Sequence, residues 1–293
     1  MSAKELGQIH TVNFRRNGLT NADSNTLVQE LDLSGELTQQ LQQICRQGNF
    51  FKVVGIDMSI GPLSVPAGQG QTGHITGFLR YFTPTRGRCA AYRHAFKAMA
   101  EQMENQGIPM RKNKLYDFRV ALSNNAQITA VQALRNNATL DGTNGLALVH
   151  ASVPGASVFG VYNKSVQPVD DKSASEQFDE GFDTLLQSGA GKTDFVLNDT
   201  NLYSGNPMTA STEVETIPFS LSYGPNGSTS FQFRPDPALY QAVMCGLFEI
   251  FVEDCDTNAQ LGLELNTSIQ VAGWKSIMGE PGKKKSRRSR RKA

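Results

Sequence analysis

The stretch LELNTSIQV, residues 263–271, alternates apolar and polar residues. A period of two is typical of a β-strand with one face in a core and the other in water. The stretch TIPFSLSY, residues 216–223, has the same period. The side chains predicted to face the core are Leu263, Leu265, Ile269 and Val271 in the first stretch, and Ile217, Phe219, Leu221 and Tyr223 in the second. Both stretches therefore predict half-buried strands.

The same pattern extends to most of the chain. Residues 51–60 would bury Val54, Ile56, Met58 and Ile60, and residues 116–122 would turn Tyr116, Phe118, Val120 and Leu122 to one side, with Asp117 and Arg119 opposite. Further strands are predicted near residues 9–14, 26–33, 75–82, 146–152, 157–162, 229–233 and 247–253. Stretches such as VPAGQGQTG and YGPNGSTS carry the Gly and Asn residues that tight turns need. The chain is therefore expected to be all-β, of the sandwich or jelly-roll kind.

Two helices are predicted among these strands. Residues 88–106 form the longer helix, and Gly107 stands where a left-handed cap would end it. Its buried side is expected to consist of Cys89, Tyr92, Phe96, Met99 and Met103, which recur at three- and four-residue spacing. A shorter helix would follow Asp236, with Pro237 at its first position and Gly246 beyond its end.

These two helices suggest an internal repeat. Each follows a strand through a connection containing Pro and Arg, and each leads into an aromatic strand, YDFRVAL or LFEIFVED. Tyr92 and Tyr240 take equivalent places, 148 residues apart. A repeat of this length predicts two tandem jelly-roll sandwiches with short helices in their connections. The predicted boundaries are 1–163 for the first jelly roll with an N-terminal arm, 164–282 for the second, and 283–293 for a tail.

The net charge is unevenly distributed along the chain. The tail KKKSRRSRRKA, residues 283–293, holds eight basic residues and no acidic one. These are Lys283, Lys284, Lys285, Arg287, Arg288, Arg290, Arg291 and Lys292. The chain has 28 Lys and Arg residues and 27 Asp and Glu residues, so residues 1–282 carry a net charge of −7. The protein is an acidic body with a cationic tail.

The composition of the tail is typical of a nucleic-acid-binding segment. It has no large apolar residue, so we expect it to be disordered on its own. Cations near phosphates release condensed counterions, which gives sequence-independent, salt-sensitive binding. Its eight cations are the predicted nucleic-acid-binding residues. Two other interpretations stay open, namely binding to anionic lipid head groups and a nuclear-import signal.

The sequence offers no pattern for catalysis or cofactor binding. The string SGAGKT, residues 188–193, resembles a phosphate-binding loop, but Leu186 stands where that loop needs glycine. The four histidines, which are far apart, are His10, His74, His94 and His150. The acidic pairs Asp170–Asp171 and Glu253–Asp254 could supply oxygens to calcium between subunits, with a solvated loop as the simpler interpretation. We therefore expect that the protein is not an enzyme and that it binds no metal and no cofactor.

The four cysteines suggest a protein made in a reducing compartment. Cys45, Cys89, Cys245 and Cys255 form no C-x-x-C pair and are predicted to be buried thiols.

The sequence has no apolar run near 18 residues, so no membrane-spanning helix is expected. The first ten residues lack the apolar stretch of a secretory signal. Trp274, near the tail, is predicted to belong to the core.

Two tandem sandwiches, helices in matching connections and a cationic terminus together resemble the double jelly-roll major capsid proteins. The stretches that carry the resemblance are RCAAYRHAFKAMAEQ and YDFRVAL in the first half, and DPALYQAVM and LFEIFVED in the second. The compact size is most similar to the coat proteins of small icosahedral, internal-membrane bacteriophages of the corticovirus and finnlakevirus kind. The resemblance covers residues 8–277 and is one of element order, because this family has no short diagnostic motif. The Arg-rich tail departs from the smallest members and suits genome contact more than lipid contact.

The resemblance implies a structural function. In such proteins the jelly rolls stand upright in the shell, trimers form pseudo-hexameric capsomers, and the inner ends face membrane or genome. It implies as partners the protein itself in trimers and a lattice, the viral genome at the tail, internal-membrane lipids, and minor capsid or spike proteins. It also implies assembly in the host cytoplasm and location in the virion capsid.

Three alternatives to this interpretation remain open. The first is another capsid lineage, with one larger jelly roll and an inserted domain. The second is a cellular jelly-roll module that binds carbohydrate or nucleic acid. The third is a jelly-roll enzyme of the cupin type, against which the scattered histidines argue.

Overall fold

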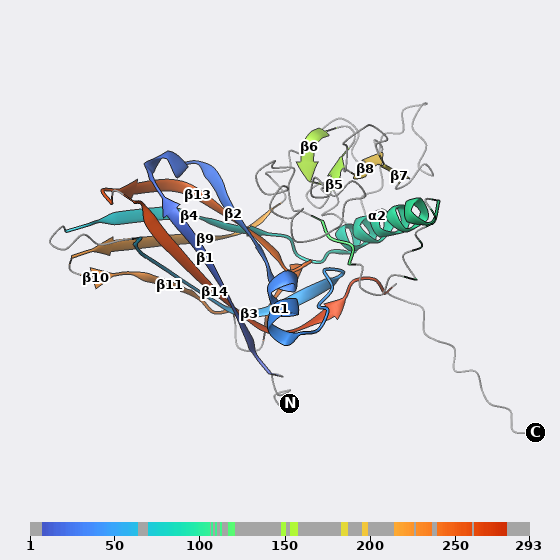
Figure 1. Ribbon diagram of the computed structural model, residues 1–293, viewed down its shortest axis with the longest axis horizontal. Helices are drawn as coiled ribbons and strands as arrows, with labels where there is room; N and C mark the ends of the chain where they lie inside the picture. Colours follow the sequence, from blue (N-terminus) through green and yellow to red (C-terminus); the bar gives the residue numbers. More distant parts are fainter. Residues whose placement is uncertain are drawn as a thin grey trace, which may run out of the picture.

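The computed structural model of the chain describes residues 8–63, 70–105, 107, 109, 112, 117–120, 148–150, 153–157, 183–186, 195–198, 214–225, 227–235, 239–259 and 261–279. Most of these residues lie in antiparallel strands, and two sheets face each other across a common core (Figure 1). The expectation of an all-β protein is therefore confirmed.

The two sheets are built from strands of both ends of the chain. Sheet A has the order β1 (His10–Leu19), β14 (Leu263–Ser276), β3 (Asn49–Pro62) and β11 (Ser230–Phe233), and β12 (Gln241–Met244) also pairs with β3. Sheet B has the order β10 (Gly227–Ser228), β9 (Glu215–Gly224), β4 (Gly73–Tyr81), β13 (Leu247–Thr257) and β2 (Thr26–Asp32).

The pairing of the strands is that of one long hairpin rolled up on itself. Leaving out the short β10 and β12, eight strands of the sandwich follow one another in the chain. The first pairs with the last, β1 with β14, and the second with the seventh, β2 with β13. Likewise β3 pairs with β11 and β4 with β9. Each sheet takes alternate pairs, and this arrangement is a jelly roll.

The sandwich has two different ends, which we call the turn end and the terminus end. At the turn end the connections are short and hydrogen-bonded to one another: Thr257 N–H donates to Asn21 Oδ1 at 2.8 Å and Asn258 N–H to the Thr72 carbonyl at 3.2 Å. A 3-10 helix, Asn21–Asp23, lies there.

The terminus end carries the long connections and the beginning and end of the sandwich. Helix α1 (Leu33–Leu41) connects β2 to β3, and helix α2 (Arg86–Asn105) follows β4 (Figure 1). The start of β1 and the end of β14 also meet there, since the rings of His10 and Trp274 are 6.1 Å apart. Trp274 packs against the core at its edge, which confirms the prediction for this residue.

A segment between β4 and β9, residues 82–214, is inserted at the tip of the rolled hairpin. Its described parts include α2 and a small sheet. This sheet has the order β6 (Val153–Ser157), β5 (Leu148–His150), β8 (Phe195–Asn198) and β7 (Asp183–Leu186), in which β5 and β8 are parallel. The insertion leaves the sandwich at Tyr81 and returns at Glu215, and these two residues are register partners.

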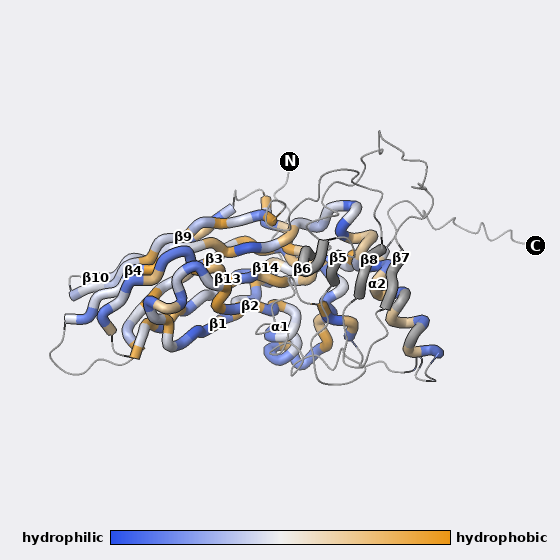
Figure 2. Tube along the Cα trace, turned by 90° about the horizontal axis from the view of Figure 1, so that it is seen from above, coloured by the Kyte–Doolittle hydropathy of each residue, from blue (hydrophilic) through white to orange (hydrophobic). Residues whose placement is uncertain are grey.

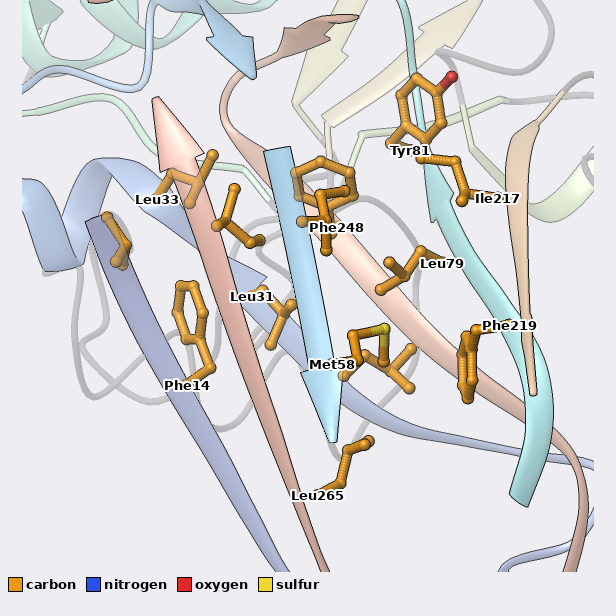
Figure 3. Close-up of a cluster of buried hydrophobic side chains, with 14 of the residues drawn as sticks. Phe14, Leu31, Leu33, Met58, Leu79, Tyr81, Ile217, Phe219, Phe248 and Leu265 are labelled. Carbon is orange, nitrogen blue, oxygen red and sulfur yellow. The ribbon is translucent and has the colours of Figure 1, made fainter. Parts of the chain in front are cut away.

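The core lies between the two sheets and is formed by residues predicted to face inward. Phe14 and Leu265 of sheet A meet Leu79, Phe219 and Phe248 of sheet B (Figure 3). The hydropathy along the strands alternates accordingly (Figure 2). A fully buried Leu, Ile or Phe side chain contributes about 1.5–3 kcal/mol, so this cluster is the main source of stability.

Most predicted strands are confirmed, with one change of face in β3. Ile56, Met58 and Ile60 are buried as predicted, but Val53 points inward in place of Val54. The register between β3 and β14 shifts between Gln270 and Val271. A bulge at this position exchanges the two faces of the strand beyond it.

The strands do not divide at residue 163 as the predicted tandem jelly rolls, 1–163 and 164–282, would require. Strands β1 to β4 and strands β9 to β14 alternate within the same two sheets. The predicted boundary between residues 163 and 164 itself lies outside the described residues. A period of two identifies which face of a strand is buried, but it does not identify the partner strand, and here the partners come from opposite ends of the chain.

The longer predicted helix is confirmed, and the shorter one is wrong. Helix α2 begins at Arg86, and Gly107 has the predicted positive φ, +79°. In place of the helix after Asp236, residues Gln241–Met244 form β12, because hydrogen bonding to β3 outweighs their weak helical signal. Tyr240 is 38% exposed and precedes a strand, whereas Tyr92 is buried in a helix, so the two are not equivalent.

A two-residue turn connects β12 to β13 across the two sheets. Its residues, Cys245 and Gly246, have φ values of +58° and +68°. Positive φ at both central positions is the backbone of a tight type I′ turn. A Cβ at Gly246 would lie 2.7 Å from Cδ2 of Phe51, so glycine is required there for space as well as for φ. Gly246, which was predicted to stand beyond the end of a helix, is thus the second residue of a turn after a strand.

Candidate nucleic-acid interface

The segment from Ile277 to Gly279, which we call the tail root, connects β14 to the cationic tail. The Ile277 N–H donates to the Gly48 carbonyl at 3.1 Å, and the Met278 N–H donates to Ser276 Oγ at 3.1 Å. Arg93 of α2 donates from Nη1 to the carbonyls of Ile277, at 3.0 Å, and Gly279, at 3.5 Å. The position at which the tail leaves the body is therefore held against α2.

Helix α2 has one buried side and one exposed side that carries cations. Tyr92, Met99 and Met103 are at most 3% exposed, as the spacing predicted. Cys89 and Phe96 are only half-buried, because they stand at the margin of that side. Arg86, Arg93 and Lys97, which we call the cation stripe, are spaced by seven and four residues and so share one side of the helix. Arg86 and Lys97 are exposed and Arg93 is half-buried.

The base of the insertion is closed by a buried arginine. The Arg88 side chain is fully buried, and its Nη1 donates to both carboxylate oxygens of Glu215, at 2.7 and 2.9 Å. Thr83 donates to the same carboxylate from its hydroxyl at 2.8 Å and from its N–H at 3.2 Å. The Arg88 guanidinium also lies 4.8 Å from the centre of the Phe82 ring. The start of the insertion is thereby fixed to the first residue of β9.

A second buried arginine fixes residues 117–120 of the insertion to α1. Arg119 donates from Nη1 to Asp32 Oδ2 at 2.7 Å and from Nε to Asp117 Oδ2 at 2.9 Å. It also donates from Nη2 to Ser34 Oγ at 3.1 Å. Asp32 is at the same time the N-cap of α1, since its Oδ1 accepts from the Gly35 N–H at 3.1 Å. One carboxylate therefore joins the helix start to the insertion.

Backbone hydrogen bonds complete this attachment. The Gln47 side chain exchanges two hydrogen bonds with the backbone of Val120, at 2.6 and 3.0 Å. The Tyr92 hydroxyl donates to the Phe118 carbonyl at 2.7 Å, and the two rings meet edge to face at 5.3 Å. Residues 117–120 form no strand, contrary to the prediction for 116–122. Asp117 and Arg119 still point away from Phe118, but α1 and the Cys45–Gln47 segment cover that side.

The electrostatics of this cluster reflect its burial. Burial raises the pKa of Asp117 above its ordinary value of 3.8, and this outweighs the charge and hydrogen bond of Arg119, which lower it. Burial lowers the pKa of the Arg119 guanidinium, but Asp32 and Asp117 raise it by more. Arg119 is therefore held in its charged form, and its charge is neutralised inside the protein.

The turn end is acidic. Asp23, Glu253, Asp254 and Asp256 gather around the end of β13 and the 3-10 helix. Glu253, Asp254 and Asp256 are exposed. Burial, followed by the negative charges of Asp23, Asp254 and Asp256, raises the pKa of the Cys255 thiol to about 11. The pair Glu253–Asp254 lies in strand β13 and not in a loop. Among the described residues, no group of three or more His, Cys, Asp or Glu side chains could hold a metal.

The predicted nucleic-acid-binding residues, Lys283, Lys284, Lys285, Arg287, Arg288, Arg290, Arg291 and Lys292, lie outside the described residues. The SGAGKT string at 188–193 and the pair Asp170–Asp171 lie outside them as well. The cation stripe was not predicted: Arg93 and Lys97 lie on the predicted helix, residues 88–106, but Arg86 precedes it and belongs to α2 only in the structure.

The cysteines are free thiols, three of them buried. Cys45, Cys245 and Cys255 are at most 2% exposed, as predicted, and Cys89 is half-buried. Burial is the main cause that raises the pKa of the Cys45 thiol, to about 12, and of the Cys245 thiol. Such thiols are protonated and weakly reactive at neutral pH.

The molecule was compared with known proteins at the level of family, sequence and structure. Within the described residues, no helix is both long and apolar enough to cross a membrane. No protein-family model, no curated protein and no solved structure matches the chain.

Proposed function

We propose that this chain is the coat subunit of an icosahedral virus, built on one jelly roll with an inserted segment, with its cationic tail bound to the packaged genome. The observation that carries the proposal is the rolled hairpin with its two unlike ends. A jelly roll with its connections gathered at two ends offers lateral faces for packing against copies of itself. The tail root leaves from the terminus end only.

The single-jelly-roll form of the proposal replaces the tandem form. A double jelly roll would need a complete second sandwich from residues 82–214, because the strands on both sides of them already form one. The proposal therefore keeps only one feature of the resemblance to the corticovirus and finnlakevirus coat proteins, namely a jelly roll that stands upright in the shell. The proposal includes assembly of the subunit with itself into trimers and a capsid lattice. The other proposed partners are internal-membrane lipids and minor capsid or spike proteins.

The charge distribution supports this function. Residues 1–282 carry a net charge of −7, so the body as a whole does not favour a polyanion. The eight cations of the tail supply the attraction instead. A subunit of this kind can hold a genome without the body adhering to it. A cellular carbohydrate- or nucleic-acid-binding module, by contrast, needs one pocket of convergent polar groups and no self-assembly.

The test is light scattering coupled to size-exclusion chromatography on the full chain and on a chain ending at Gly282, each with and without single-stranded DNA. We expect both chains to form trimers or larger assemblies, and only the full chain to bind DNA, less tightly as salt rises. A monomer that ignores DNA would overturn the proposal and favour a ligand-binding module.

A further inference from the structure

The cation stripe of α2 lies where the tail begins. Arg93, in the middle of the stripe, donates to the Ile277 and Gly279 carbonyls of the tail root. Gly279 precedes Lys283 by four residues, and four residues span at most about 14 Å. No more than about 14 Å of chain therefore separates Gly279, to which Arg93 of the stripe donates, from the first cation of the tail.

Among the described residues, Glu101 and Glu104 lie on the same side of α2 as Lys97, four and seven residues further along, and cancel part of the charge of the stripe. Glu215 is paired with Arg88, and Asp32 and Asp117 share the one charge of Arg119, all in buried or half-buried contacts. Lys97 has an ion-pair partner in Glu101, but the N–O distance is 3.7 Å and the two side chains are 75% and 64% exposed. An exposed pair of this kind contributes little, and its lysine stays available to a phosphate.

Other cations extend the positive charge around the tail root. Lys275 is exposed at the end of β14, and Arg46 is exposed two residues before Gly48, which accepts from Ile277. The opposite end of the sandwich carries the exposed carboxylates of Glu253, Asp254 and Asp256. The described part of the molecule thus has a positive and a negative end along the direction of its strands.

We infer that the cation stripe binds the phosphate backbone of the same nucleic acid as the tail, so that the terminus end of the subunit faces the genome and the turn end faces away. This inference rests on the proposed function and adds to it the orientation of the subunit. Arg86 and Lys97 provide the contacts as exposed charges, and Arg93 positions the tail root beside them. Binding of this kind reads phosphate and not base sequence.

The experiment compares two charge-matched double variants of the full chain. Arg86→Gln with Lys97→Gln removes two exposed cations of the stripe, and Gln is a good helix former. Arg15→Gln with Arg16→Gln removes two cations from the half of β1 nearer the turn end. The affinity for a thymidine 30-mer is measured across a range of salt concentrations. For single strands, each cation that no longer neutralises a phosphate reduces the steepness of log K against log salt by about 0.7.

We expect the slope to fall by about 1.4 in the stripe variant and to stay unchanged in the β1 variant. Equal slopes in the two variants, with circular dichroism showing both folded, would overturn the inference. The proposed function would survive that outcome if the chain ending at Gly282 loses DNA binding and still assembles. A full chain that does not bind the 30-mer at any salt concentration would overturn both.

Discussion

At the scale of single residues, the most consequential side chains are the two buried arginines. Arg88 and Arg119 are each at most 7% exposed, and each pairs with a carboxylate from another part of the chain. A buried ion pair adds little net stability over an apolar pair, but removing one partner leaves a buried charge uncompensated. Their role is to specify how the insertion sits on the sandwich.

Arg119→Met is expected to destabilise the protein by about 3–5 kcal/mol, because Asp32 and Asp117 would lose their counter-charge in a buried site. Urea unfolding followed by circular dichroism measures the change. Arg15→Met is the matched control, because the Arg15–Glu264 pair is exposed on the Arg15 side and should cost less than about 1 kcal/mol. Equal losses in the two variants would contradict the interpretation of the Arg119 cluster.

Asp117 also predicts a dependence of stability on pH. Its folded-state pKa lies above the ordinary 3.8, so the folded protein takes up a proton there more readily than the unfolded chain does. The contribution of Asp117 to stability therefore falls as pH rises from below 3.8 through the folded-state pKa. Asp117→Asn removes this contribution, so the stability of the variant relative to the natural chain should increase with pH over that window. The free energy of unfolding of both chains is measured in steps of pH. A difference between the two chains that stays constant over the window would contradict the prediction.

At the scale of elements, β4 and β13 approach each other more closely than a side chain allows. A Cβ at Gly77 would lie 2.2 Å from the carbonyl oxygen of Phe251. These strands form the middle of sheet B, where a shift of backbone disturbs both neighbours. The register between them shifts between Val252 and Asp254, close to this contact. The glycine is required for space, because its φ is not in the left-handed region.

Gly77→Ala is accordingly expected to cost about 1–3 kcal/mol or more. Gly61→Ala, in β3, is the matched control, because a Cβ there meets no atom within 4 Å. We expect the control to be neutral or stabilised by about 0.5 kcal/mol, since alanine restricts the unfolded chain more than glycine does. Thermal unfolding followed by calorimetry compares the two, and a tolerated Gly77→Ala would show that β4 and β13 can separate.

The elements also show how far the sequence could predict the structure. Strands such as β9 and β14 were predictable because each has one face in the core and one in water. Strand β12 was not, because it is stabilised by its pairing with β3, which no local pattern encodes. Helix α1 was missed, although Asp32 as a cap and Leu33, Leu37 and Leu41 at four-residue spacing were visible. The Arg119 cluster was missed because a period of two assigns Asp117 and Arg119 to water, whereas both sides of residues 117–120 are covered.

At the scale of the whole molecule, the sandwich and the insertion are separable in their cores. The main cluster of buried apolar residues draws on residues 12–81 and 217–271 and on none of the described residues between them. The insertion joins the sandwich at Tyr81 and Glu215, which are already neighbours across two paired strands. Sandwich stability therefore depends little on the length of the insertion.

A chain in which a short Gly-Ser turn replaces residues 84–213 is expected to keep the sandwich. Its far-ultraviolet circular dichroism should remain that of a β protein, and it should unfold cooperatively at a lower temperature than the full chain because the ion pairs of Arg88 and Arg119 are removed. The matched control is the full chain carrying Arg119→Met. A shortened chain without a cooperative transition would show that the insertion is part of the folding unit.

The pairing of β1 with β14 has a consequence for the timing of synthesis. His10 and its register partner Val271 are 261 residues apart in the chain, so His10 leaves the ribosome long before Val271 is made. At about 5–20 residues per second this delay lasts tens of seconds. During that time sheet A lacks the strand that separates β1 from β3, so a nascent chain cannot present a finished subunit to its neighbours. The fold thus ties the first moment of possible self-assembly to the completion of β14, a few residues before the cationic tail emerges.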